Sequence, residues 1–368
     1  MEASTMVASR MGWWLQQWWA SRIGSWQQLN LSVVYMSQPP GFIDPSRPDH
    51  VCLLKRSLYG LKQDHRMWNK RFTDALTSLG FLGSKTDSSL FYMSTPSDKL
   101  FCLIYVDDIL VLGNNPARIK SLVAQLQSQF AVRDLGTLSY FLGITASWTS
   151  EGLFLSQKKY VEELLRRVQM ELCSPVNTPI SPTSKLSSSG GVPFNDPTLY
   201  RSIVGAMQYL TFTRPDVADA VNKFYNIASW LYRFRLGGDI DDRKSTTGFA
   251  IYLGNHLISW SSRKQRAVSR SSTEAEYRAI AATTSEITWV EFLLREIGCF
   301  ISSNLSATYL TANPIFHSRT KHMEIHFHFV RDKVRAKTLL VRYVSSLDQV
   351  ADLLTKPLSK SRFLELKI

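Results

Sequence analysis

The stretch from Phe101 to Gly113 reads FCLIYVDDILVLG, and it decides the fold that we predict for the first half of the chain. Two short apolar runs flank the pair Asp107 and Asp108, a pattern that predicts a tight hairpin with both carboxylates at its tip. Because both arms are apolar, the hairpin is expected to belong to a buried sheet.

The two neighbouring carboxylates predict a cation site. Adjacent negative charges repel each other, and a bound cation relieves that repulsion. Hard divalent ions such as magnesium take carboxylate oxygens together with substrate phosphates, and two such ions stabilise the attacking and leaving oxygens of phosphoryl transfer. We therefore predict that Asp107 and Asp108 are catalytic residues that bind magnesium as a cofactor. The alternative is a polar hairpin turn without a metal, because aspartate is common in turns.

Apolar spacing on both sides of the hairpin predicts further elements. One helix is expected over residues 68–79, where Trp, Phe and two Leu recur at helical spacing. A second helix is expected to begin with Asn115 as its cap and Pro116 in its first turn. Residues 138–144 are predicted to form a strand.

A basic helix and a linker are expected next. Ser156 is a candidate cap for a helix that carries Lys158 and Lys159 outside its apolar face. Five of the 14 prolines then fall between Ser174 and Thr198, among Ser and Gly, which indicates a linker near a domain boundary. Beyond it, the patterns predict helices over 200–211, 217–228 and 273–297, strands over 249–253, 256–260 and 339–344, and a short helix capped by Ser346.

Composition narrows the class of protein. The chain has 368 residues, enough for about two domains, and 44% of them are hydrophobic. Its 43 Lys and Arg outnumber 30 Asp and Glu, giving a net charge of +13 that favours nucleic acid as a partner, with an anionic membrane surface as second choice.

The four cysteines form no Cys-x-x-Cys pair, which argues against a disulfide scaffold or zinc knuckle and favours the cytoplasm or nucleus. No signal peptide or membrane span is expected.

Several motifs carry a resemblance to a known family. Tyr105 to Asp108 is similar to the Tyr-x-Asp-Asp motif of reverse transcriptases. The neighbouring motifs resemble those of copia-type long-terminal-repeat retrotransposons in order and approximate spacing: YMSQPPGF (35–42), SLYGLKQ (57–63), DLG with YFLGI (134–144) and YRSIVG (200–205). The chain is identified as a member of that family, a truncated copy of the Pol polyprotein region that holds reverse transcriptase and ribonuclease H.

The resemblance implies roles for residues outside the hairpin. Nucleic-acid-binding residues are expected near the template and incoming nucleotide, in a turn at 141–144 that grips the primer end, and on the thumb helix that follows Ser156. They are Tyr59, Gly60, Lys62, Gln63, Leu142, Gly143, Lys158 and Lys159. The implied partners are an RNA template, a DNA primer or RNA–DNA hybrid, and nucleotides.

The polymerase part departs from the family pattern. The family places a third Asp on the strand beside the hairpin, in a Leu-Asp-Val segment before the YMSQPPGF motif, and the nearest match here is Asn30. The fingers are also missing, and residues 1–30 instead hold five of the ten tryptophans. Loss of one of three metal-binding acids is expected to impair catalysis by orders of magnitude.

A second set of motifs resembles the ribonuclease H domain of the same elements: DIDDRKSTTG (239–248), ISWSS (258–262), SSTEAEY (271–277) and HSRTKH (317–322). The implied catalytic and metal-binding acids are Glu276 and Asp352, with Glu274 as the weaker alternative for the first. The family's other two acids fall at Arg233 and Ser303, residue types that bind magnesium poorly or not at all.

The basic segment that follows residue 262 predicts further contacts with phosphates. Arg263 and Lys264 are candidates for them, and a solvated basic loop is the alternative.

These expectations combine into one prediction. The fold class is α+β or α/β, a partial reverse-transcriptase palm and thumb followed by an incomplete ribonuclease H-like domain. The expected divisions are 1–30 as an unplaced leader, 31–173 as palm and thumb, 174–235 as linker and connecting helices, and 236–368 as the ribonuclease H-like domain. The expected function is that of a catalytically impaired reverse transcriptase and ribonuclease H fragment. The alternatives are a non-catalytic nucleic-acid-binding remnant and a chain that forms no stable fold.

Overall fold

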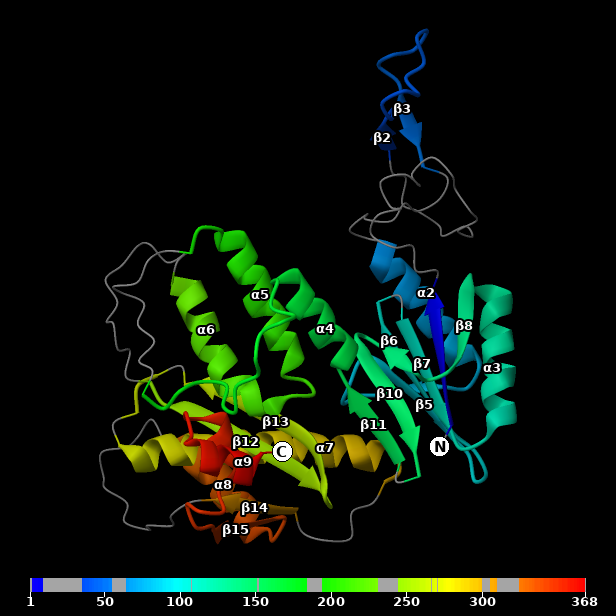
Figure 1. The fold of residues 1–368 in the computed structure, drawn as a ribbon. Coiled ribbons are helices and arrows are strands. Elements are labelled where there is room, and N and C mark those ends of the chain that lie inside the picture. Colours follow the sequence, from blue (N-terminus) through cyan, green and yellow to red (C-terminus); the bar gives the residue numbers. More distant parts are fainter. Residues whose placement is uncertain are drawn as a thin grey trace. The chain divides into compact units, whose positions relative to one another are not determined.

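The structure is a computed structural model that describes residues 2–8, 35–54, 64–106, 108–150, 152–183, 194–230, 244–265, 267–269, 271–299, 305–309 and 324–367. These residues form two compact units (Figure 1). The first comprises Met1–Leu142 with Glu296–Gly298, and the second comprises Gly143–Arg295 with Cys299–Ile368. The predicted functional division near residue 174 stays a prediction.

The first unit is built on a six-stranded sheet with the order β4-β5-β6-β7-β1-β8. Its strands are β4 (Leu82–Gly83), β5 (Leu90–Ser94), β6 (Lys99–Tyr105), β7 (Asp108–Gly113), β1 (Glu2–Ala8) and β8 (Val132–Thr137). Every neighbouring pair in this order is antiparallel. The predicted hairpin is thus confirmed as β6 and β7, and it lies inside the sheet.

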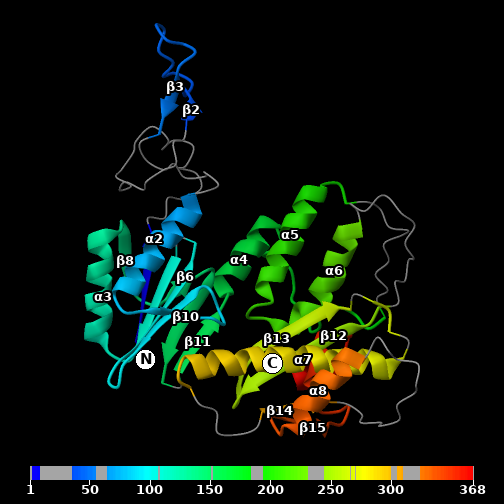
Figure 2. The ribbon, with the colours of Figure 1, turned by 180° about the vertical axis from the view of Figure 1, so that it is seen from behind.

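Strand β1 is an element that no pattern in the sequence predicts. It lies between β7 and β8 and pairs with both, with an irregularity in the β8 register between Ser4 and Met6. The backbone of a central strand donates and accepts hydrogen bonds on both sides. The first residues of the chain therefore join the two parts of the sheet, as both views show (Figures 1 and 2).

Two helices share a core with the sheet. Helix α2 (Asp64–Ser78) buries Phe72 and Leu76 completely, and helix α3 (Pro116–Gln129) adds four buried apolar residues to the same cluster. The rings of Trp68 and Phe72 stack with centroids 5.1 Å apart, and Phe130 meets Phe72 edge-on at 5.0 Å. The helices predicted from apolar spacing are confirmed.

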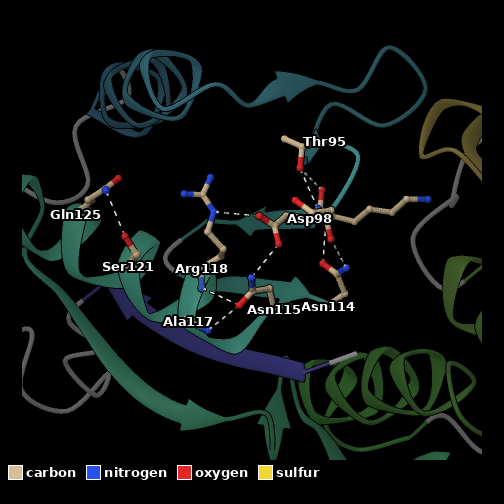
Figure 3. Close-up of polar contacts among 10 residues, drawn as sticks. Thr95, Asp98, Asn114, Asn115, Ala117, Arg118, Ser121 and Gln125 are labelled. Atoms are coloured by element: carbon tan, nitrogen blue, oxygen red, sulfur yellow. Dashed lines mark hydrogen bonds and ion pairs between the residues drawn. The ribbon is translucent and has the colours of Figure 1, made fainter.

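The start of α3 is fixed to the loop before β6 (Figure 3). The Asn115 side chain accepts hydrogen bonds from the backbone N–H groups of Ala117 and Arg118, at 3.1 and 3.4 Å. Its amide also donates to an Asp98 oxygen at 2.8 Å, and Arg118 lies 3.6 Å from the same carboxylate. Capping of this kind contributes about 1 kcal/mol. The predicted cap and first-turn proline are confirmed, and this network secures the end of the hairpin away from its tip.

Cysteine reactivity offers a test of this core. Cys102 on β6 is fully buried, and burial raises the pKa of its thiol to about 12. Only a thiolate reacts readily with alkylating reagents, so Cys102 is expected to resist iodoacetamide at pH 8 while the exposed Cys173 reacts. Mass spectrometry of the labelled chain, with and without denaturant, measures this. Equal labelling of both thiols under native conditions would contradict the buried position of β6.

A small separate pair of strands contains part of the YMSQPPGF motif. Strand β2 (Tyr35–Ser37) pairs antiparallel with β3 (Val51–Leu53). The Gln38 side chain ties the loop between them, donating to the carbonyls of Arg47 and His50 at 2.8 and 2.9 Å.

The second unit begins with a hairpin and four helical segments. Strands β10 (Ile144–Thr149) and β11 (Gly152–Ser156) pair antiparallel. They are followed by α4 (Lys158–Arg167), α5 (Pro197–Leu210), the short 3-10 helix η1 (Pro215–Val217) and α6 (Ala218–Trp230). Ser156 ends β11 and the cap position of α4 is Gln157, so the prediction of Ser156 as a helix cap was wrong.

The predicted strand over 138–144 was also wrong. The structure has β9 (Tyr140–Phe141) and β10 in this region, separated by a two-residue turn at Leu142 and Gly143. The segment reads LSYFLGI and is mostly apolar, and its glycine is the single residue that indicates a turn.

The rest of the second unit holds β12 (Thr246–Leu253), β13 (His256–Lys264), α7 (Ser272–Glu296), β14 (Leu305–Tyr309), α8 (Glu324–Arg335), β15 (Leu339–Tyr343), the 3-10 helix η3 (Val350–Leu354) and α9 (Lys360–Leu366). Strands β12 and β13 pair antiparallel, whereas β14 and β15 pair parallel. Side chains of β12, α7, α8 and β15 share one core that includes Ile251, Ile280, Val330 and Leu339. The predicted short helix starts at Gln349, not at Ser346, and it is a 3-10 helix.

Among the residues that the structure describes, no helix is both long and apolar enough to cross a membrane.

Candidate functional site

The tip of the β6–β7 hairpin is exposed and strained. The pairing runs from Leu100 opposite Gly113 to Tyr105 opposite Asp108, which leaves a two-residue turn. Val106, the first turn residue, has a φ of 52°. A β-branched side chain in the left-handed region costs of order 1–3 kcal/mol, a strain that is often found at functional sites. The second turn residue, Asp107, lies outside the described residues, so the structure tests only one of the two predicted acids.

Asp108 is half-buried at the start of β7, and the register defines its neighbours. Tyr105 lies opposite it on β6, Val7 lies opposite it on β1, and Arg133 of β8 lies opposite Val7. Among the described residues, β1 is the strand beside β7 of the hairpin on this side, and its residue opposite Asp108 is a valine. Asn30, the nearest match by sequence, lies outside the described residues.

The remaining acids of this part of the sheet are placed unfavourably. Glu2 of β1 pairs with Gly113, at the opposite end of β7 from Asp108. Asp134 pairs with Met6, so it lies one residue along the sheet from the paired residues Asp108, Val7 and Arg133. It accepts a hydrogen bond from the Gly136 N–H at 2.8 Å. Successive residues of a strand face opposite sides of a sheet, so Asp134 and Asp108 are on opposite faces. Among the described residues, the sheet therefore supplies one carboxylate on the face of Asp108 near the tip.

The turn expected to grip the primer has an unusual backbone. Leu142 and Gly143 have φ values of 49° and 78°, and positive φ at both central residues is typical of a type I′ hairpin turn. A methyl group added to Gly143 would lie 3.1 Å from Cε1 of Tyr209. Sequence reasoning named both turn residues but missed Tyr209, which no local pattern links to them.

The basic side chains predicted to bind phosphates are accessible. Lys158 and Lys159 are exposed in the first turn of α4, and Glu162 and Glu163 follow them at the spacing that brings opposite charges together on a helix. Arg263 and Lys264 are exposed at the end of β13. The predicted contacts at Tyr59, Gly60, Lys62 and Gln63 lie outside the described residues.

The two acids of the predicted ribonuclease H site have different surroundings. Glu276 on α7 is half-buried, whereas Asp352 on η3 is mostly buried and lies 2.8 Å from Nζ of Lys356. Glu274, the alternative, is only 2% exposed, and it accepts a hydrogen bond from Arg278 at 2.6 Å. Glu274 is thus held inside the fold by an ion pair. Across the described part of the chain, no three His, Cys, Asp or Glu side chains are grouped in a way that could hold a metal ion.

Two buried acids that sequence reasoning missed lie near η3. Asp216 is bound by Arg214 through two hydrogen bonds of 2.8 and 2.7 Å, which raise the pKa of the guanidinium, and Asp219 lies 2.6 Å from Nζ of Lys223. Both acids line a small pocket together with Lys356. Since each acid is paired with a cation only two or four residues away, both belong to local ion pairs around the start of α6.

Comparisons with known proteins agree with the motifs. Residues 25–182 match the family model described as "Reverse transcriptase (RNA-dependent DNA polymerase)". The chain is 44% identical to the retrovirus-related Pol polyprotein from transposon RE1 of Arabidopsis thaliana, over 90% of this chain and 25% of the relative. It is 43% identical to that from transposon RE2 of the same plant, over 90% and 26%.

A third, less similar relative is of the same kind. Identity to the Pol polyprotein from transposon TNT 1-94 of Nicotiana tabacum is 32%, over 90% of this chain and 29% of the relative. The chain thus spans about a quarter of the length of these relatives. No solved structure matches it. The matched region and the high identity over nearly the whole chain show that it belongs to the reverse transcriptase family of copia-type retrotransposon Pol polyproteins.

Proposed function

We propose that the chain is a reverse transcriptase and ribonuclease H fragment that binds nucleic acid and is impaired in both catalytic activities. The observation that carries the proposal is the backbone register beside Asp108, where the residue of β1 opposite this acid is Val7 and not a second acid. In this proposal the first unit is the palm and Asp107 with Asp108 are its remaining acids. Helix α4, which follows β11, belongs to the thumb, and α5 and α6 are the connecting helices.

The donor set explains the proposed impairment. A two-metal site supplies charge stabilisation at the attacking and leaving oxygens, and each magnesium ion needs several oxygen ligands. The described part of the sheet offers Asp108 alone on the relevant face, so its residues do not fit a pair of magnesium ions. Phosphoryl transfer is therefore proposed to be slow, and Asp108 is the described residue on which any remaining activity depends.

The C-terminal part of the second unit is proposed to be an incomplete ribonuclease H-like domain. Its sequence motifs support this assignment, and the strands β12 and β13 with helix α7 lie where those motifs fall. Glu276 and Asp352 are the proposed catalytic acids. Asp352 is engaged by Lys356 at 2.8 Å, and a neighbouring cation competes with a metal ion for a carboxylate. We propose that hydrolysis of the RNA strand is lost.

The proposed partners are an RNA template, a DNA primer or RNA–DNA hybrid, and nucleotides. The net charge of +13 and the exposed cations on α4 and β13 support binding of a polyanion. The same observation favours a second candidate function, a non-catalytic nucleic-acid-binding remnant. The two differ in one respect: a remnant binds without any turnover.

A primer-extension assay with magnesium tests the proposal. The purified chain, the Asp108→Asn variant and a salt series of template–primer binding are measured together. We expect salt-sensitive binding, and slow extension that Asp108→Asn abolishes. Fast extension that Asp108→Asn abolishes would contradict the impairment, and binding without any extension would favour the remnant. Absence of binding at low salt would refute both functions.

The role of the α4 lysines can be measured separately. The double variant Lys158→Gln, Lys159→Gln is expected to reduce the slope of log Kobs against log salt by about 0.9 for each phosphate that is no longer neutralised, because each neutralised phosphate releases counterions. The matched control is Lys360→Gln with Lys367→Gln, which removes two exposed charges at the C-terminal helix α9 and just after it. Equal slopes in the two double variants would show that only net charge matters.

A further inference from the structure

The turn between β9 and β10 adopts a conformation that its sequence does not favour. Leu142 has a φ of 49°, and a leucine in the left-handed region costs of order 1–3 kcal/mol. Such a conformation persists when surrounding groups determine it. Gly143 follows with a φ of 78°, where a glycine carries no steric cost. Groups packed against Gly143 must therefore hold this turn.

The ring of Tyr209, near the end of α5, occupies the space beside Gly143. A Cβ atom at position 143 would lie 3.1 Å from Cε1, 3.4 Å from the hydroxyl oxygen and 3.6 Å from Cζ of this tyrosine. The first distance is shorter than ordinary van der Waals contact, so a Cβ atom here would require the ring to shift by a few tenths of an ångström. The ring and the turn are thus closely packed at Gly143.

Tyr209 is itself held firmly by α4 and the end of α5. Its ring meets Tyr160 edge-on with centroids 5.3 Å apart, and Phe212 lies 5.4 Å away. Gln157, only 3% exposed, donates to the Tyr209 carbonyl at 3.3 Å and accepts a hydrogen bond from Thr213 at 2.8 Å. Backbone and ring of Tyr209 are therefore both held by neighbouring groups, which oppose a shift of the ring away from Gly143.

The Tyr160 hydroxyl adds a further link between the two helices. It donates a hydrogen bond to the Ala206 carbonyl at 3.1 Å, and burial raises the pKa of this hydroxyl. As a result α4, which follows the β10–β11 hairpin, is joined to the part of α5 that carries Tyr209.

We propose that Tyr209 is a positioning residue: it holds the Leu142–Gly143 turn in its left-handed conformation so that the turn can contact the primer strand of a bound template–primer duplex. The inference rests on the proposed function, because contact of this turn with a primer is part of that function. It adds a residue about 66 positions away in the sequence that determines the geometry of the contact.

A double-mutant cycle tests the coupling. The variants are Gly143→Ala, Tyr209→Leu and both together, and the readouts are the Kd for a template–primer duplex and the melting temperature. Gly143→Ala is expected to weaken binding about tenfold, and Tyr209→Leu is expected to weaken it about fivefold. If the two effects were independent, the double variant would show their product. We expect it to bind at least about threefold more tightly than that, because the added methyl group no longer meets the ring. Tyr209→Phe keeps the ring and is expected to restore binding to within about twofold.

A control on the same helix separates positioning from general stability. Tyr200 donates to the Phe224 carbonyl at 3.2 Å and packs beside Phe194 at 5.7 Å. Tyr200→Leu is expected to lower the melting temperature as much as Tyr209→Leu but to leave the Kd within about twofold. Additive effects in the cycle, or an equal weakening of binding in Tyr200→Leu, would overturn the inference while the proposed function stood. A wild-type chain that binds no template–primer would overturn both.

Discussion

Replacement of Met6 by proline is expected to unfold the sheet of the first unit, lowering its free energy of unfolding by about 3 kcal/mol or more. Met6 pairs with Ile109 of β7 on one side and with Asp134 of β8 on the other. Proline has no N–H group and therefore removes a ladder hydrogen bond from a central strand, where the acceptor on the neighbouring strand is left buried without a donor.

The matched control is Met6→Ala, which changes the same side chain but keeps the backbone donor. Urea unfolding is followed by alkylation of Cys102, whose burial in this unit makes it a local probe. We expect a large shift of the midpoint for proline and a much smaller one for alanine. Equal shifts would mean that the side chain matters more than the backbone pairing. No shift in either variant would show that β1 does not belong to the sheet.

The elements that could be predicted from the sequence are those with local signals. Helix α3 has a cap at Asn115, a proline in its first turn and apolar residues at helical spacing, and the structure confirms all three. The β6–β7 hairpin was predicted for the same reason, since two apolar runs with a polar pair between them leave few alternatives. These features depend on neighbouring residues, so no knowledge of the remaining fold was needed.

Strand β1 could not be predicted because its pairing is non-local. Its residues EASTMVA show no regular alternation, and their partners on β7 and β8 lie more than a hundred residues away in the sequence. The turn at Leu142, which interrupts the predicted strand, could not be predicted for a related reason. A leucine at positive φ is disfavoured locally, and the ring that supports the turn, Tyr209, comes from a distant helix.

The candidate site divides in the same way. The motif around Asp108 was recognised from consecutive residues, and the structure places this aspartate at the start of β7 as the hairpin required. The missing third acid stays a prediction, because Asn30 lies outside the described residues. The register of β1, which puts Val7 opposite Asp108, could be learned only from the structure.

This register leads to a prediction of gained function. In the variant Val7→Asp, the new carboxylate and Asp108 occupy directly opposed positions of an antiparallel pair, whose side chains leave the sheet on the same face with Cβ atoms about 5 Å apart. Two opposed carboxylates repel each other, so the variant is expected to be less stable than the wild type without a divalent ion. Magnesium is expected to restore that stability, because an ion that binds only the folded chain stabilises it.

Activity is expected to follow stability in this variant. Magnesium-dependent primer extension by Val7→Asp should exceed that of the wild type by about a hundredfold, which corresponds to roughly 3 kcal/mol of added transition-state stabilisation. Val7→Asn has nearly the same shape without the charge and should show neither the magnesium-dependent rise in melting temperature nor the gain in rate. The double variant with Asp108→Asn should lose both. A gain in Val7→Asn equal to that in Val7→Asp would show that polarity, not a second carboxylate, limits this copy. If Val7→Asp responded to magnesium in melting temperature but not in rate, a second carboxylate beside Asp108 would not be what limits primer extension.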